Sequence, residues 1–144
     1  MGVINIKIKL LNESAILPEK QHDSDAGYDL YSIEDVILKP NQIYKVKTGI
    51  SIQIPNNYGG LVLPRSGLSS KHGISLINTP GLIDSGYRGE LLIPLINHSS
   101  NEYKINQHER VAQLILIETP EVKIEVTNDL DDSDREAKGF GSTG

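Results

Sequence analysis

The sequence contains no cysteine and no tryptophan, and among its 144 residues it has a single phenylalanine, Phe140. The absence of cysteine excludes disulfide bonds and metal sites with cysteine ligands. The apolar residues are mostly Ile, Leu and Val, so we expect an aliphatic core. Phe140 stands almost at the end of the chain, where it cannot form that core, and it needs another explanation.

The chain also lacks long hydrophobic runs and an excess of positive charge. No apolar run approaches the length that spans a bilayer, and residues 1–10 lack the apolar stretch of a signal peptide. The formal net charge of −5 argues against non-specific binding to duplex DNA. We therefore expect a soluble, cytoplasmic protein (host-intracellular if its source is a phage or virus) with no membrane or direct nucleic-acid partner.

The sequence does contain a recurring alternation of apolar and polar residues, which is typical of half-buried β-strands. Turn residues such as Pro55-Asn56-Asn57 separate the alternating segments. The pattern predicts one all-β domain, a sandwich or jelly roll, in which Pro94 places its strand at an edge or bulge. The expected strands are Ile4–Leu10, Ile43–Lys47, Ile50–Ile54, Gly60–Leu63, Leu91–Asn97, Val111–Ile117 and Val122–Val126.

Two segments depart from the strand pattern. Ser66–His72 is the best candidate for a short helix, with Ser66 as its N-cap and basic residues at its end. From residue 127 onward the chain is acidic and then Gly-rich, so burial cannot offset the entropy lost on ordering it. We expect a β domain over residues 1–126 and a flexible lid over residues 127–144 that a ligand or partner orders. A simple solvated tail is the alternative.

Several polar residues carry candidate chemistry. Arg65 beside the start of the expected helix is a candidate anion site, because free backbone N–H groups point outward there, although such a helix start taken alone slightly favours a purely structural role. Asp84 is a candidate general base for activating water, or a simple turn residue. Asp25 and Asp29 fit either a turn or a site for Mg²⁺ acting through bound water. Gln113 is polar within an apolar run and must find a hydrogen bond from a ligand or from the backbone.

Five motifs occur in a fixed order between residues 25 and 144: D-A-G-Y-D-L, P-R-S-G-L-S-S-K-H-G-I, G-L-I-D-S-G-Y-R-G-E-L, E-R-V-A-Q-L and R-E-A-K-G-F-G-S-T-G. Together they resemble the motifs of trimeric dUTP pyrophosphatases (dUTPases). The resemblance implies a distorted jelly-roll barrel with one short helix, and a homotrimer with its sites at subunit junctions. It also implies Mg²⁺-assisted hydrolysis of dUTP to dUMP and pyrophosphate, with water attacking the α-phosphate. That reaction limits uracil incorporation into DNA and supplies dUMP for thymidylate synthesis.

The resemblance further implies roles for individual residues. Asp84 corresponds to the carboxylate that activates water, and Tyr87 to the ring that packs on deoxyribose and leaves no room for a 2′-hydroxyl. Asp29 corresponds to the residue that holds water on Mg²⁺, and Phe140 to the ring that stacks over uracil. The other implied substrate contacts are Arg65, Ser66 and Gln113 at the phosphates, with Gly67 beside them; Asn78, Gly81 and Ile83 in a hairpin from Ile74 to Ile83 that reads uracil; and Arg135, Gly141, Ser142 and Thr143 in the tail that closes on the γ-phosphate.

One departure from the family pattern lies in the tail. The tail motif usually has more glycine between its Arg and its Phe, and here Glu136 and Lys138 occupy such positions. This difference is expected to alter the closing of the lid and not the substrate class. Two other functions stay open. One is a dCTP deaminase-like enzyme of the same fold, against which Asp84, Tyr87 and Phe140 argue. The other is a nucleotide-sensing regulatory protein that binds a protein partner.

Overall fold

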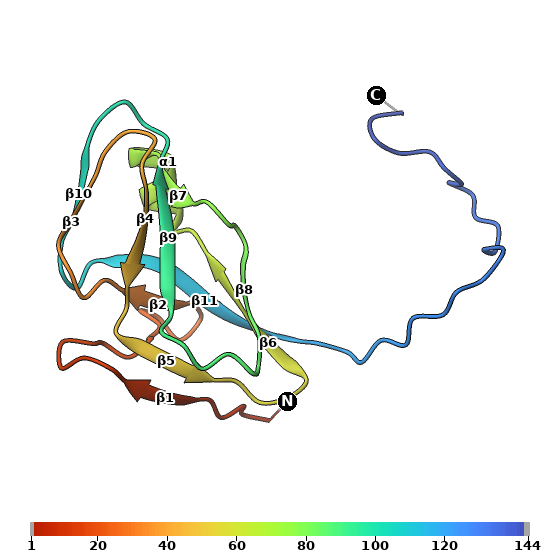
Figure 1. The fold of residues 1–144 in the computed structure, drawn as a ribbon, viewed down its shortest axis with the longest axis horizontal. Helices are drawn as coiled ribbons and strands as arrows, with labels where there is room; N and C mark the ends of the chain where they lie inside the picture. The colour runs from red at the N-terminus through yellow and green to blue at the C-terminus, as the bar shows by residue number, and fades with distance from the viewer. Residues whose placement is uncertain (1, 143–144) are drawn as a thin grey trace.

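The structure is a computed structural model that describes residues 2–142, and it shows a β-rich body from which the end of the chain projects (Figure 1). In the described residues, no helix is both long and apolar enough to cross a membrane. The elements in chain order are β1 (Lys7–Leu10), β2 (Tyr28–Tyr31), β3 (Val36–Leu38), β4 (Ile43–Lys47), β5 (Ile50–Gln53), β6 (Tyr58–Leu63), α1 (Ser66–His72), β7 (Ile74–Leu76), β8 (Gly81–Ile83), β9 (Leu92–Asn97), β10 (Tyr103–Ile105) and β11 (Arg110–Glu118).

The strands of the body form small antiparallel sheets that mix early and late parts of the chain. The largest has the order β2-β11-β6-β8, and a three-stranded sheet has the order β4-β9-β7. Two further pairs, β1 with β5 and β3 with β10, complete the body. Because β2 pairs with β11, the first motif and the fourth motif lie side by side. The prediction of an all-β fold with one short helix is confirmed.

The core is aliphatic, as the composition indicated. Leu38, Val46, Ile93 and Ile105 have no exposed surface. Burial of each such side chain contributes about 1.5–3 kcal/mol to the free energy of unfolding. Phe140, in contrast, is fully exposed on the projecting tail and takes no part in the core.

The expected strands agree with the structure where a neighbouring strand is present. Ile43–Lys47 is β4 with the same bounds, and the other expected strands within residues 4–117 differ only at their ends. Val122–Val126 was wrong, because it forms no strand, and its apolar side chains are exposed. Alternation supplies an apolar face, but a strand also needs a partner for its backbone groups. In the described residues, this segment pairs with no other strand.

The expected position of Pro94 at an edge or bulge was also wrong, because β9 is the central strand of its sheet. Pro94 pairs with Lys45 of β4 without a shift in register. On the other side its carbonyl accepts a hydrogen bond of 3.0 Å from the backbone N–H of Ile77, which lies just past the end of β7. The N–H and C=O of a strand residue point to the same side. The nitrogen of Pro94 therefore faces away from β4, and its missing donor breaks no bond of the β4–β9 ladder.

Candidate functional site

The first candidate site is an open cavity of about 200 Å³ beside β8, here called the arm cavity. Its wall combines apolar side chains with polar groups, as small-molecule sites do. The structure brings together five residues that the sequence singled out for the base, the sugar and the attacking water. The lining consists of Val62, Leu76, Asn78, Gly81, Leu82, Ile83, Asp84, Tyr87, Glu90, Leu92 and Pro94.

The expected hairpin from Ile74 to Ile83 was wrong in its pairing. β7 pairs with β9, and β8 pairs with β6, so the two strands belong to different sheets. All three residues of each short strand pair with that other partner, so β7 and β8 have no ladder in common. Asn78 lies in the connection between the two sheets, at the wall of the arm cavity.

Tyr87 is fixed in the segment that follows β8, and this segment (residues 84–90) is here called the arm. The backbone N–H of Tyr87 donates to the carbonyl of Asp84 (3.1 Å), and the Tyr87 hydroxyl donates to the carbonyl of Glu90 (2.8 Å). The ring lies over Gly89, where a Cβ atom would stand only 2.5 Å from the Tyr87 hydroxyl oxygen. Glu90 ties the end of the arm to the body, because its carboxylate accepts a 3.0 Å hydrogen bond from the N–H of Gly49.

The second candidate site is a more polar hollow of about 360 Å³ at the start of α1, here called the polar pocket. The structure brings together there the residues that the sequence assigned to the phosphates and to the metal. The lining consists of Gln21, His22, Asp25, Ala26, Gly27, Asp29, Arg65, Ser66, Gly67, Arg110 and Gln113.

Two guanidinium groups flank the carboxylate of Asp29 in the polar pocket. Arg65 Nε is 3.7 Å from one carboxylate oxygen, and Arg110 Nη1 is 3.6 Å from the other. The Asp29 side chain is only 13% exposed, and the two guanidinium groups pair with its carboxylate. Arg65 also donates a 3.3 Å hydrogen bond to the carbonyl of Arg110. Because one carboxylate balances only one of the two positive charges, the pair of guanidinium groups can bind a further anion.

Gln113 has a hydrogen bond to the backbone, which is one of the two partners that its sequence position left open. Its side-chain amide donates to the carbonyl of Pro64 (3.0 Å) and thereby joins β11 to the residue before Arg65. Gly27 makes this possible, since a Cβ atom there would lie 2.6 Å from the Gln113 side-chain oxygen. The first and fourth motifs therefore constrain each other at this contact.

The helix α1 has the expected bounds, Ser66–His72, but its N-cap is not the expected residue. Arg65 is the N-cap, with φ −87° and ψ 132° and no side-chain cap bond, and its carbonyl accepts the first helical hydrogen bond from Ser69 (3.1 Å). The expectation of Ser66 as N-cap was therefore wrong, because Ser66 already has helical conformation. Its N–H stands in the first turn at the polar pocket. Lys71 and His72 occupy the last turn, as expected.

The pKa values of Tyr31 and Tyr103 are raised. Burial and a hydrogen bond to Glu19 raise the pKa of Tyr31. Tyr31 also accepts a 3.2 Å hydrogen bond from Gln21, which lines the polar pocket. Burial and then the hydrogen bond to Glu109 raise the pKa of Tyr103 to about 12. Both hydroxyls stay protonated near neutral pH and act as hydrogen-bond donors that hold loops in place.

The polar pocket offers few ligands for a metal ion. Within residues 2–142, no three His, Cys, Asp or Glu side chains are grouped as a metal site. Asp29 and Asp25 are the carboxylates that line the pocket. Mg²⁺ keeps several waters and is commonly bound by one or two carboxylates together with substrate phosphates. The residues present fit that mode of binding and do not form an all-protein cage.

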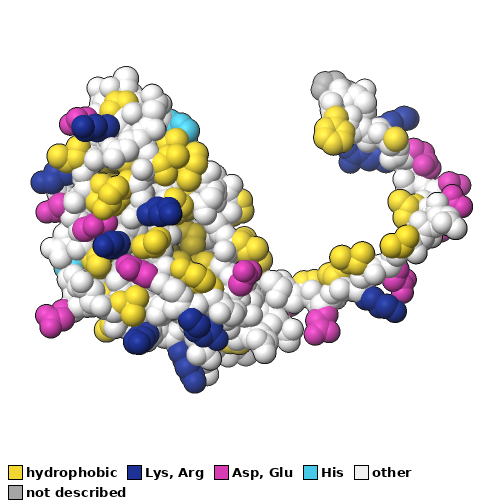
Figure 2. All heavy atoms as spheres, viewed as in Figure 1, with side chains coloured by type: hydrophobic (Ala, Val, Ile, Leu, Met, Phe, Trp, Pro, Cys, Tyr) yellow, Lys and Arg dark blue, Asp and Glu magenta, His cyan; other side chains and the backbone are white. Residues whose placement is uncertain are grey.

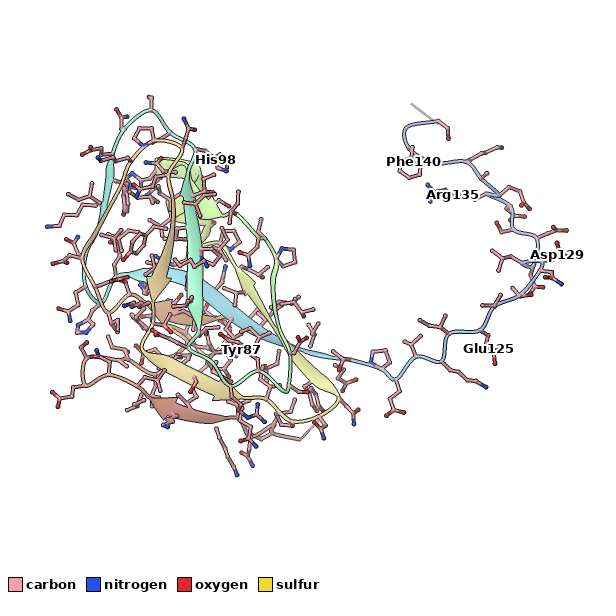
Figure 3. The ribbon with its side chains drawn as sticks, in the orientation of Figure 1. Tyr87, His98, Glu125, Asp129, Arg135 and Phe140 are labelled. Carbon is pink, nitrogen blue, oxygen red and sulfur yellow. The ribbon has the colours of Figure 1, made fainter. Side chains whose placement is uncertain are left out.

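The tail residues that the sequence assigned to the site lie away from both cavities. Arg135 and Phe140 are on the projecting segment, whereas Tyr87 is on the body (Figure 3). In the space-filling view the tail is an extended segment that is separated from the body (Figure 2). Gly141 and Ser142 are exposed like Phe140. Thr143 lies outside the described residues.

Sequence reasoning missed Arg110, Gly89 and Glu90 as parts of the site. Arg110 is in the fourth motif and Gly89 and Glu90 are in the third, so membership of a motif was a signal for each. Their roles arise from neighbours in space, namely Asp29, the Tyr87 ring and the N–H of Gly49.

Known proteins resemble the chain over nearly its full length. The dUTPase family model matches residues 13–144. A deoxyuridine 5'-triphosphate nucleotidohydrolase of Clostridioides difficile is 49% identical over 140 residues, which cover 97% of this chain and 98% of the relative. The enzyme of the same name from Alkaliphilus metalliredigens is 46% identical over 142 residues, which cover 99% of each chain.

Solved structures agree with these matches. A mutant Staphylococcus bacteriophage 80alpha dUTPase with dUpNHpp has a TM-score of 0.90 at 32% identity, covering 97% of this chain and 98% of that chain. A mutant dUTPase from phage phi11 of S. aureus, whose structure is described as showing the coordination of a structural Mg(II) ion, has a TM-score of 0.83 at 29% identity. That match covers 89% of this chain and 99% of the phage chain. The chain belongs to the dUTPase family.

Proposed function

We propose that this chain hydrolyses dUTP to dUMP and pyrophosphate by Mg²⁺-assisted attack of water on the α-phosphate. Acting in the cytoplasm, it limits uracil incorporation into DNA and supplies dUMP for thymidylate synthesis. One observation carries the proposal: the protein has two hollows of complementary chemistry. The arm cavity suits a base and a sugar, and the polar pocket, with two guanidinium groups at the start of a helix, suits a polyphosphate.

In the arm cavity, Asn78 and the backbone around Gly81 and Ile83 read uracil. The wall of the cavity excludes the methyl group of thymine sterically. Cytosine presents an amino donor where uracil presents an acceptor, so its binding leaves buried polar groups unpaired. The Tyr87 ring, tied to the carbonyl of Glu90, packs on deoxyribose and leaves no room for a 2′-hydroxyl.

The phosphate oxygens of the nucleotide are bound by Arg65, Ser66, Gly67 and Gln113. Asp84 accepts a proton from the attacking water. Mg²⁺, when bound with the nucleotide, spreads charge over the phosphate oxygens. Asp29, which lies between Arg65 and Arg110, would hold water on the ion. Phosphoryl transfer needs positioning, charge neutralisation and an oriented nucleophile, and these residues provide all three.

We also propose that the chain is a homotrimer with its sites at subunit junctions. The arm cavity and the polar pocket share no lining residue, which supports completion of each site by another copy. Val122, Ile124 and Val126 expose apolar side chains that a neighbouring copy can cover. An apolar groove beside β1 supports the same assembly; it is lined by Ile4, Ile6, Ile8, Leu17, Pro18, Tyr28, Leu114 and Leu116.

Within the trimer, residues 127–144 act as a lid on the domain formed by residues 1–126. The lid brings Arg135, Ser142 and Thr143 to the γ-phosphate, with Gly141 beside them, and Phe140 over uracil. The full exposure of Phe140 supports this role, because an aromatic side chain without a packing partner is available for a base.

A substrate panel tests the proposed function. The purified chain is supplied with dUTP, dCTP, dTTP or UTP, with and without Mg²⁺, and pyrophosphate and ammonia are followed separately. We expect pyrophosphate from dUTP in the presence of Mg²⁺ and little from the other nucleotides. Ammonia from dCTP indicates a deaminase and contradicts the proposal, as does equal turnover of dUTP and UTP.

A further inference from the structure

The tail contains a hydrogen-bonded turn over residues 133–138, here called the tail turn. The backbone N–H of Ser133 donates to the carboxylate of Glu136 (2.9 Å), and the N–H of Glu136 donates to the hydroxyl of Ser133 (3.1 Å). The same reciprocal exchange occurs in the capping box at helix starts, where each side chain satisfies the other residue's N–H. The tail turn forms without contact to the body, as the separation in Figure 3 shows.

The tail turn holds the Arg135 side chain in a defined place. Arg135 Nε donates a 2.6 Å hydrogen bond to the carbonyl of Lys138, and the N–H of Lys138 donates to the carbonyl of Arg135 (3.1 Å). The guanidinium group lies over Gly139, where a Cβ atom would stand 3.3 Å from Nη2. Arg135 is therefore fixed beside the residue that precedes Phe140.

The backbone of Glu136 explains why its side chain matters. Glu136 has φ 51°, in the left-handed region that residues other than glycine rarely adopt. Glycine adopts this conformation readily but has no side chain to bind the N–H of Ser133. Glutamate accepts a less favourable backbone conformation and gains that hydrogen bond. The difference from the glycine-rich family pattern at this position thus has a structural consequence.

We propose that Ser133 and Glu136 form the tail turn before nucleotide binds, and that the turn presents Arg135 to the terminal phosphate. This inference rests on the proposed function, in which the tail closes over dUTP. Ordering a free chain opposes closure through lost backbone entropy. A turn that already restricts residues 133–138 reduces the entropy that remains to be lost. Glu136 is accordingly a positioning residue that acts through Arg135.

The test compares two substitutions that remove the same charge. Glu136→Gln keeps a side-chain oxygen that can accept from Ser133, whereas Glu136→Ala does not. Affinity is measured by calorimetry with Mg²⁺ for the non-hydrolysable analogue dUpNHpp and for dUMP, which lacks the γ-phosphate. Loss of one hydrogen bond predicts roughly threefold to tenfold weaker dUpNHpp binding for Glu136→Ala, and a change within about twofold for Glu136→Gln. We expect dUMP affinity to stay unchanged in both variants.

A second measurement examines the tail turn without nucleotide. Amide hydrogen exchange, followed by NMR in the nucleotide-free protein, is expected to be slower at Ser133 and Glu136 than at the exposed Asp129. Glu136→Ala and Ser133→Ala should each abolish the difference. The double variant should bind dUpNHpp no more weakly than either single variant, because both substitutions disrupt the same hydrogen-bonded turn.

The outcomes separate this inference from the proposed function. Unchanged dUpNHpp affinity in Glu136→Ala, equal losses in the Ala and Gln variants, or an equal loss for dUMP overturns the role of the tail turn. Arg135→Ala serves as the reference for the lid itself. If Arg135→Ala leaves dUpNHpp affinity intact, the tail does not hold the terminal phosphate, and the proposed lid fails together with this inference.

Discussion

At the scale of single residues, the arm depends on a glycine that carries no chemistry. Tyr87 can lie flat against the arm only because Gly89 has no side chain, and its hydroxyl reaches the Glu90 carbonyl across that glycine. Sequence reasoning found Tyr87 from its motif but gave Gly89 no role. The reason is physical: residue type reveals what a side chain can do, whereas the need for an empty space appears only with the neighbour in place.

Gly89→Ala is expected to displace the Tyr87 ring and to admit a 2′-hydroxyl. We expect discrimination between dUTP and UTP, measured as the ratio of their kcat/KM values, to fall by about tenfold. Gly86→Ala is the matched control in the same arm, because a Cβ atom there meets nothing within 4 Å. A fall in discrimination for both variants, or for neither, contradicts this role of Gly89.

At the scale of elements, a buried polar side chain binds backbone groups at the ends of strands. Asn97, the last residue of β9, has no exposed surface, and its amide donates to the carbonyls of Leu38 and Asn101 (2.9 and 2.8 Å). Its side-chain oxygen accepts from the N–H and the hydroxyl of Ser99 (2.9 and 2.7 Å). One side chain thereby joins β9, β3 and the turn that leads to β10.

Asn97→Ala is expected to lower the free energy of unfolding by about 2–4 kcal/mol, because it leaves buried backbone groups unpaired. Urea unfolding followed by circular dichroism measures the change. Asn106→Ala is the control, since Asn106 is exposed and no hydrogen bond of its side chain is described. Equal stability of the two variants shows that the Asn97 network does not hold the strands together.

The elements also show where sequence patterns stop being informative. Alternation over four or more residues predicted β1, β4, β5, β6, β9 and β11, because each presents apolar side chains to the core. The three-residue strands β3, β7, β8 and β10 are too short to show a period. Pairing is a property of the whole fold, so the sequence could not show that β7 and β8 join different sheets or that β9 is central.

At the scale of the whole molecule, the five motifs predicted the candidate site residues but not their arrangement in space. The structure places them in two separate hollows and on a projecting tail. Composition and periodicity support only a β-rich body with an unusual tail. The motifs supply the candidate residues, and the way in which separate copies combine them depends on contacts beyond a single chain.

A mixing experiment examines that combination. Asp84→Ala is expected to keep nucleotide binding and lose turnover, and truncation before Ser133 is expected to lose turnover through the missing lid. If one copy's tail closes another copy's site, mixing the two inactive variants under conditions of subunit exchange restores part of the dUTP hydrolysis. Light scattering verifies that each variant keeps the proposed trimeric mass. Exchange without recovered activity contradicts a tail shared between subunits.

The full exposure of Phe140 has a spectroscopic consequence in a chain without tryptophan. An indole introduced by Phe140→Trp is the sole source of tryptophan fluorescence, and it starts in contact with water. Stacking on a base changes both its emission maximum and its intensity. Stopped-flow mixing with nucleotide then follows closure and reopening of the tail directly, on a background that no other tryptophan obscures.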